Sequence, residues 1–180
     1  MNVIANGLTL HVEEFGDPAA PAVLLIMGLA MPAAAWPDEF IERLVEHGLR
    51  VIRFDNRDAG GSDRARGPRR YGVQVAIMRA LLRLPVHAPY TLDDMAKDTA
   101  GVLDALGIRR AHVVGASMGG MIAQVLAARH PERVATLTSI MSSSGNPSPS
   151  VALGSHRALD QFRHAKLTQH RFLVGDPQRW

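Results

Sequence analysis

The chain has 180 residues, a formal net charge of +3 at pH 7 and a hydrophobic fraction of 47%, which is enough to bury one core without metals or disulfides. It contains no cysteine, which excludes disulfides and thiolate chemistry and favours a reducing, cytoplasmic environment. We expect no membrane partner, because the sequence shows no signal peptide and no run of about 18 apolar residues. We expect no nucleic-acid partner either, because basic runs such as those at 64–83 and 157–179 are typical of solvated faces.

Two early segments have the patterns of strands. Residues 8–15 partly alternate between apolar and polar side chains before a break at 16–18, which predicts an antiparallel edge strand with one wet face. Residues 23–27 are continuously apolar and precede Gly28. That pattern is typical of a strand buried on both faces of a parallel sheet.

A helix and another strand follow. Pro37 suits the first position of a helix, and the acidic pair after it faces the positive end of the helix dipole. Gly48 ends this helix, and residues 49–55 predict the next strand, which leads into a turn-rich stretch at 56–62. The helix has an apolar stripe that we expect to be buried, formed by Phe40, Ile41, Leu44 and Val45.

Residues 63–90 interrupt this alternation and are interpreted as an inserted segment. We expect a helix in it, with Arg79 and Arg83 opposite an apolar face. Packing against the domain or covering the site is the favoured role of this helix, and a position on a membrane surface is the alternative. The apolar face consists of Val73, Ala76, Ile77, Ala80, Leu81 and Leu84.

The alternation resumes at Thr91. Thr91 and Asp94 resemble a capping box, and the helix that they open ends at Gly107. A short apolar strand at 111–114, a helix that ends before His130 and a strand at 135–141 come next. Strands and helices thus alternate from residue 23 to residue 141, which predicts a mostly parallel sheet with right-handed crossovers and helices on both faces.

The character of the chain changes at Ser142. Residues 142–150 have the composition of a loop, and residues 151–180 are basic without a clear period. We therefore expect a core unit over residues 1–147 and, over 148–180, either the beginning of a cap region or an irregular tail.

Ser117 lies in a G-x-S-x-G pattern between a buried strand and a helix. In that context a sharp turn would lift the serine hydroxyl above the carboxyl edge of the sheet, as in a nucleophile elbow. Gly115 and Gly119 are expected because a Cβ atom at either position would collide across the turn. The helix directs free amides and the positive end of its dipole toward an oxyanion, so the Met118 amide is the first predicted donor.

A second oxyanion donor is expected from the loop that follows the strand at 23–27. Gly28 permits an unusual backbone there, and the amide of Leu29 is our candidate for the donor. No cysteine-histidine or carboxylate constellation suggests a metal, and Asp58-Ala59-Gly60-Gly61 lacks the lysine and helix of a phosphate-binding loop. We expect neither a metal nor a cofactor.

Several of these motifs, in this order, resemble the α/β-hydrolase family, and within it the methylesterases similar to aclacinomycin methylesterase. The resemblance covers residues 1 to 147. Many family members have His-Gly where this chain has Met27-Gly28, and the methylesterase group shares the methionine. The matching segments are 27–28, 36–40, 51–60 and 111–119.

The resemblance implies an α/β-hydrolase fold and hydrolysis of carboxylic esters. It makes Ser117 the nucleophile and Met118 an oxyanion donor, and it assigns Asp55 and Arg57 to holding a loop in place. The family continues through a cap and two strands that supply an aspartate and a histidine. This chain ends at Trp180, so we expect a truncated, impaired form without most of the cap, the C-terminal strands, and the triad acid and base.

The remaining histidines offer no obvious base. His156, His164 and His170 follow the elbow, but we expect them to be surface residues of the tail, as are Asp160 and Asp176. Earlier in the chain, His112 begins a strand, His130 closes a helix, and His11, His47 and His87 are assigned to turns or edges.

The leading hypothesis is a serine hydrolase acting on a small-molecule ester, and the alternative is a non-catalytic binding protein of the same fold. An elbow serine favours acyl transfer over the opening of epoxides, which uses an aspartate. The sequence leaves the identity of the ester and the oligomeric state open.

Overall fold

Strand β3 (Ala22–Ile26) lies inside a six-stranded sheet of order β1-β2-β4-β3-β5-β6. The computed structural model describes residues 1–65, 75, 78 and 89–143. β3 pairs in parallel with β4 (Arg50–Phe54) and with β5 (Ala111–Ala116), and all of its residues are buried. The continuous apolar run predicted this placement correctly, because a strand covered on both faces has no polar side.

The first two strands pair antiparallel, and their arrangement contradicts the prediction that residues 8–15 form an edge strand. β2 (Leu8–Phe15) is antiparallel to β4, as predicted, but it is not an edge strand, because β1 (Asn2–Ala5) pairs with its other side. β1 has only four residues, too few for a clear alternation. The missed signal is the turn at Asn6-Gly7, where both residues have positive φ (49° and 76°), as in the two-residue hairpins that Asn-Gly favours.

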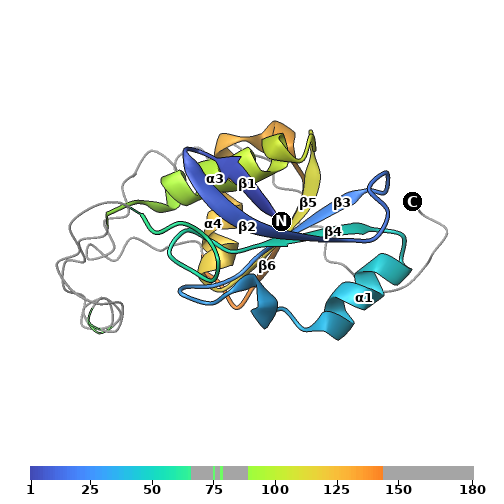
Figure 1. Cartoon of the computed structure of the whole chain (residues 1–180), viewed down its shortest axis with the longest axis horizontal. Coiled ribbons are helices and arrows are strands. Elements are labelled where there is room, and N and C mark those ends of the chain that lie inside the picture. The colour runs from blue at the N-terminus through green and yellow to red at the C-terminus, as the bar shows by residue number, and fades with distance from the viewer. Residues whose placement is uncertain (66–74, 76–77, 79–88, 144–180) are drawn as a thin grey trace.

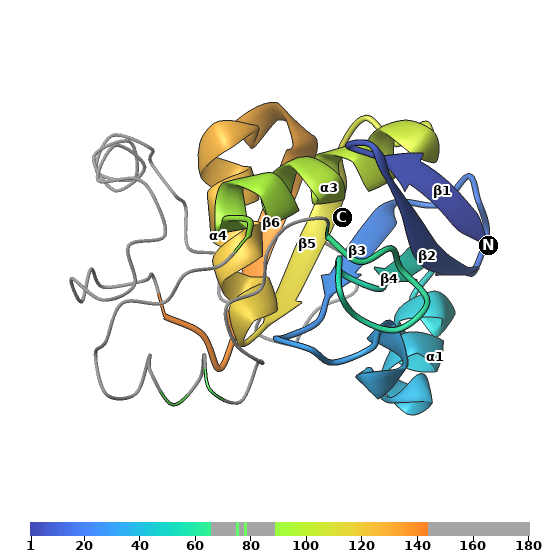
Figure 2. The ribbon, with the colours of Figure 1, turned by 60° about the vertical axis from the view of Figure 1, so that its left-hand side comes forward.

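The other end of the sheet is β6 (Val134–Ile140), which is parallel to β5. Helices cover both faces, as predicted (Figures 1 and 2). Helix α1 (Asp38–Glu46) packs near β4 on one face, while α3 (Leu92–Ala105) and α4 (Met118–Arg129) lie side by side on the other. Two 3₁₀ turns, η1 (Ala33–Ala35) and η2 (Pro131–Arg133), complete the described elements.

The core is divided by the sheet because alternate strand residues point to opposite faces. In β3, Leu24 and Ile26 belong to the cluster under α3 and α4, whereas Val23 and Leu25 pack on the side of α1. The predicted stripe of α1 packs there too: Ile41 is buried, and Phe40, Leu44 and Val45 are partly buried.

The helix ends match their sequence signals closely. Thr91 accepts a hydrogen bond from the Asp94 amide and Asp94 accepts one from the Thr91 amide, so the predicted capping box is confirmed. Pro37 lies one position earlier than predicted, at the N-cap of α1 rather than in its first turn.

Some predictions concern residues that the structure does not describe. These are the helix expected over 73–84, apart from the exposed helical residues Val75 and Met78, and the boundary at residue 147 with the tail beyond it. Within the described ranges, no helix is long and apolar enough to cross a bilayer. In the same ranges, no cluster of three or more histidine or acidic side chains could hold a metal ion.

Candidate active site

Ser117 occupies the single residue between β5 and α4. Its backbone has φ 54° and ψ −121°, a sparsely populated combination for a residue with a side chain. The side chain is exposed and makes no capping bond to α4. Ser117 therefore lies at the carboxyl end of a central strand with unusual torsions, which is the geometry predicted for an elbow.

The turn around Ser117 is closed so tightly that it excludes side chains on either side. A Cβ atom on Gly115 would overlap the carbonyl group of Gly119 and come within 2.6 Å of the Gly120 nitrogen. A Cβ atom on Gly119 would overlap the Ile26 carbonyl oxygen. Both glycines are thus required by backbone contact, since the start of α4 rests directly on the end of β3.

The elbow is held from β6 as well. The Ser117 amide donates to the Ile140 carbonyl oxygen at 2.8 Å, and the Ser117 carbonyl accepts from the Gly120 amide at 3.0 Å. The amide of Met118, the first helical residue, has no carbonyl one turn earlier in the helix to bind. That amide and the N-terminal end of the α4 dipole are therefore available to a negative charge beside Ser117.

The loop after β3 comes close to Ser117, as the sequence predicted. A Cβ atom on Gly28 would lie 3.2 Å from the Ser117 Cβ atom and 3.7 Å from its hydroxyl oxygen. Leu29, the next residue, is 41% exposed, and Ala30 has a positive φ of 57°. The predicted donor segment and the predicted nucleophile are thus brought together from positions about ninety residues apart in the chain.

Two buried polar residues after β4 hold the loop that follows β3, and the sequence did not predict this role for one of them. The Asn56 side chain donates to the Met27 carbonyl oxygen at 2.9 Å. The Asp55 carboxylate accepts from the amides of Ala33 at 2.6 Å and Gly61 at 2.8 Å. The sequence pattern placed Asn56 only in a turn; the available signal was its position two residues after the end of a buried strand.

The side chain of Arg57, next in the chain after Asn56, reaches helix α3. Its guanidinium forms two hydrogen bonds of 2.6 Å to the Asp98 carboxylate in α3 and lies over the Tyr90 ring. Asp98 also accepts from the Asn6 side chain at 2.8 Å. Through Asp98 the ion pair fastens the loop to α3 and to the β1–β2 turn.

The four described histidines lie away from Ser117. His112 is five residues earlier in β5, or about 16 Å along a strand. His130 caps the far end of the 12-residue helix α4, about 18 Å from its start. His47 caps α1. His11 lies within β2, an inner strand rather than a turn or an edge, three strands from β5 and so about 14 Å away.

His112 has its own structural role at the amino end of β5. Its Nδ1 atom lies 2.8 Å from the Thr136 hydroxyl on β6. Burial, with a smaller effect of the Arg110 charge, lowers the pKa of His112 below its usual range, so the neutral imidazole is favoured. The remaining candidates, His87, His156, His164 and His170 with Asp160 and Asp176, lie outside the described residues.

The chain belongs to the α/β-hydrolase fold family, whose model matches residues 21–176. Rhodomycin D methylesterase DnrP of Streptomyces peucetius is 44% identical over 131 residues, or 73% of this chain and 38% of that protein. A putative carbamate hydrolase, RutD of Variovorax paradoxus (strain S110), is 35% identical over 130 residues, or 72% of this chain and 41% of that protein. The expected resemblance to methylesterases is therefore confirmed.

Solved structures agree with the family assignment. The enol-lactonase from Burkholderia xenovorans LB400 has a TM-score of 0.60 and 29% identity, covering 74% of this chain and 44% of the other. The chain thus spans about two fifths of the length of the relatives that it matches.

Proposed function

We propose that the protein to which this chain belongs hydrolyses carboxylic esters through an acyl-enzyme on Ser117. One observation supports this most strongly: Ser117 is exposed in a strained backbone conformation between β5 and α4, with Gly28 beside its hydroxyl. A strained conformation persists only where its surroundings enforce it, and such residues cluster at active sites. The names of the relatives, a methylesterase and a putative carbamate hydrolase among them, favour the same chemistry.

In the proposed reaction the Ser117 oxygen attacks the ester carbonyl carbon. The carbonyl oxygen becomes an oxyanion, which the amides of Met118 and Leu29 would bind. Collapse of this intermediate breaks the bond to the alcohol, which leaves with a proton, and water then releases the acid from Ser117. No substrate or transition-state group needs a metal in this scheme.

The scheme needs a base within about 3 Å of the Ser117 hydroxyl to remove its proton. The positions of His11, His47, His112 and His130 do not suit them for this role. We therefore propose that the 180-residue chain alone is a poor catalyst. Loss of a triad member leaves about 10³ to 10⁴-fold catalysis over water, supplied by oxyanion stabilisation and binding.

The test is hydrolysis of an activated acetate ester by the purified chain, with intact-mass analysis for acetylated protein. We expect slow turnover and one acetyl group on Ser117, both lost in Ser117→Ala. A matched control is Ser62→Ala, which removes a buried serine hydroxyl outside the elbow. This control should keep both signals if it folds, as judged by circular dichroism.

Two outcomes would contradict the proposal. Hydrolysis that survives Ser117→Ala, with acetylation elsewhere, would favour the non-catalytic binding protein. Turnover near the roughly 10 s⁻¹ common among enzymes, abolished by a triple change of His156, His164 and His170, would place the base in the tail and refute the expectation of poor catalysis.

A further inference from the structure

The loop that follows β3 is held by buried side chains at both of its ends. The Asn56 amide group donates to the Met27 carbonyl oxygen at 2.9 Å. At the other end, the Asp55 carboxylate accepts from the Ala33 amide at 2.6 Å. Asn56 and Asp55 are each only 4% exposed. The candidate oxyanion donor, the amide of Leu29, lies in the chain between these two anchored points.

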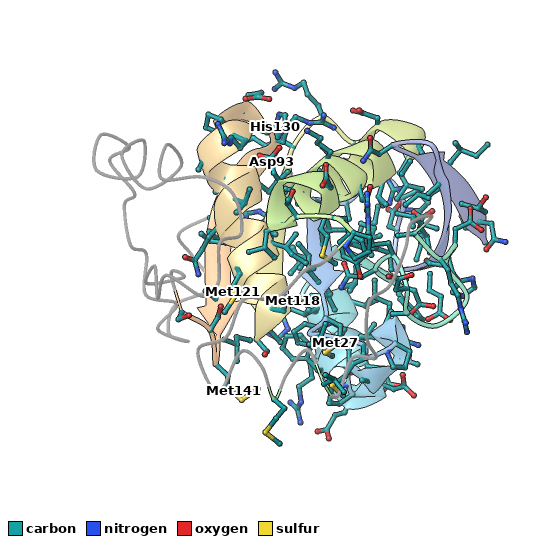
Figure 3. The ribbon with its side chains drawn as sticks, turned by 90° about the vertical axis from the view of Figure 1, so that its left-hand side faces the viewer. Met27, Asp93, Met118, Met121, His130 and Met141 are labelled. Atoms are coloured by element: carbon teal, nitrogen blue, oxygen red, sulfur yellow. The ribbon has the colours of Figure 1, made fainter. Side chains whose placement is uncertain are left out.

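The hydrogen bond from Asn56 fixes the first peptide plane of the loop. Because a peptide group is planar and trans, the Met27 carbonyl and the Gly28 amide point in opposite directions. Asn56 follows β4 and draws the carbonyl toward that strand, so the Gly28 amide faces β5, the other neighbour of β3. Ser117 directly follows β5, and a Cβ atom on Gly28 would lie 3.2 Å from the Ser117 Cβ atom. Figure 3 shows Met27 and Met118, the chain neighbours of Gly28 and Ser117, toward the same end of the ribbon.

The direction of the Leu29 amide follows from the same anchor. The Gly28 carbonyl accepts from the Met31 amide at 3.4 Å, and the Leu29 amide on that peptide points the opposite way. Gly28 has no side chain to restrict its torsions, so contacts with its neighbours must confine them. Asn56 supplies such a contact one residue earlier, at Met27.

Asn56 is committed to this loop more narrowly than Asp55 is. The Asp55 carboxylate also accepts from the Gly61 amide at 2.8 Å, and the Asp55 carbonyl accepts from the Ser62 hydroxyl at 2.6 Å, so Asp55 organises its own turn as well. Among the described residues, the side-chain amide of Asn56 donates to Met27 alone. Asparagine also suits this place because it offers a donor to a buried carbonyl without burying a charge.

We propose that Asn56 is a positioning residue, which aims the oxyanion donor of the loop at the ester carbonyl attacked by Ser117. This inference rests on the proposed function, since it assigns Asn56 to the reaction of Ser117. Asn56 acts through the peptides that follow Met27 and not by contact with the ester. Because the oxyanion forms only on the way to the acyl-enzyme, a misplaced donor slows acyl transfer and leaves binding of the ester unchanged.

The test measures the rate of Ser117 acetylation at increasing concentrations of para-nitrophenyl acetate. The limiting rate and the ester concentration that gives half of it are compared between the parent chain and Asn56→Leu, which removes the donor and keeps a side chain of similar size. The limiting rate falls by between about tenfold and a hundredfold, because losing a donor outright costs about 10² to 10³-fold and misplacing one costs part of that. The half-saturating concentration changes by less than about twofold.

Thr99→Val is the matched control. The Thr99 hydroxyl donates to the Met95 carbonyl oxygen at 2.9 Å within α3, and Thr99 is 0% exposed. This variant therefore also loses a buried hydrogen bond to a methionine carbonyl, but not one in the loop after β3. Its limiting rate stays within about twofold of the parent rate. Urea unfolding of each variant establishes that the rates refer to folded protein.

Three results would overturn the inference. They are an unchanged limiting rate in Asn56→Leu, a loss confined to the half-saturating concentration, and an equal loss of rate in Thr99→Val. Asn56→Ala, which removes the donor without adding a branched side chain, replaces Asn56→Leu if that variant does not fold. If neither variant folded, Asn56 would serve the fold itself, and the positioning role would be refuted.

Failure of the proposed function has a different signature, because the parent chain would then take up no acetyl group on Ser117. Acetylation of Ser117 at equal limiting rates in the parent and in Asn56→Leu would refute only the positioning role.

Discussion

A residue in a costly conformation must be held by its neighbours, and Ser117 illustrates how. Its backbone torsions carry a strain of about 1 to 3 kcal/mol. The bond from its amide to Ile140, the bond from the Gly120 amide, and the close packing of Gly119 on β3 hold it there. The elbow is thus a product of contacts among β3, β5 and β6.

The close packing of Gly119 on the end of β3 predicts that a side chain at this position lowers stability. Gly119→Ala places a Cβ atom onto the Ile26 carbonyl oxygen and 2.8 Å from that of Met27. Alanine would gain about 1 kcal/mol from helix propensity, but overpacking against backbone costs about 1 to 3 kcal/mol or more, so the net effect is destabilising. Urea unfolding should show the loss, together with reduced acetylation of Ser117.

Gly61→Ala is the control for this change. A Cβ atom on Gly61 would meet only the His11 side chain, at 3.4 Å, and Gly61 has no positive φ. It should change the free energy of unfolding by less than about 0.5 kcal/mol. Equal stabilities of the two variants would mean that the elbow relaxes without cost.

Among the helices, α3 is stabilised at its N-terminus by a capping box. Thr91 and Asp94 satisfy each other's amides, and Asp94 also lies near Lys97. The backbone hydrogen bond from Thr91 lowers the pKa of Asp94 below its ordinary value. The folded state therefore prefers the ionised carboxylate, and this preference links helix stability to pH.

Asp94→Ala should lower the free energy of unfolding at pH 7 by about 1 kcal/mol, a typical value for a lost cap. Because the folded pKa is lowered, this stabilisation is complete above the unfolded pKa of about 3.9 and is lost as the pH falls through the folded pKa. Urea titrations of parent and variant should therefore converge below about pH 4. The exposed α1 residue Glu42, changed to alanine, provides the control. A difference that grows toward low pH would contradict the assigned sign.

Across the whole molecule, one buried ion pair joins segments that are distant in sequence. Asp98 in α3 binds Arg57 after β4 and Asn6 in the β1–β2 turn, and the side chains of the pair are only 3% and 9% exposed. The contact thus connects the antiparallel edge of the sheet, the loop that anchors the site, and the helix layer.

Asp98→Ala should cost about 3 to 5 kcal/mol, because it leaves the Arg57 guanidinium buried without its partner. That is a large share of a typical stability of about 5 to 15 kcal/mol. Thermal and urea unfolding would measure it. The double variant Arg57→Leu and Asp98→Leu should be more stable than Asp98→Ala, since it removes both charges. A loss below about 1 kcal/mol would mean that water reaches Arg57 freely.

Local signals in the sequence were enough for most elements and for the candidate nucleophile. Each of these signals depends on residues close together in the chain, so it can be recognised in the sequence. Examples are the apolar run at 23–27, the capping box at Thr91 and the glycines around Ser117. The short strand β1 escaped notice because it is defined by its pairing with β2 rather than by its own pattern.

The sequence by itself determined the order of the described strands and helices after β1, the tight turn at Ser117 and the family resemblance, because each depends on neighbouring residues. Only the tertiary structure decided which distant groups meet. Pairing of β3 with β5 brings Gly28 beside Ser117, Asn56 after β4 reaches Met27 after the neighbouring strand β3, and the end of β6 brings Met141 to the same edge. Such contacts depend on strand order in the sheet, which no local pattern encodes.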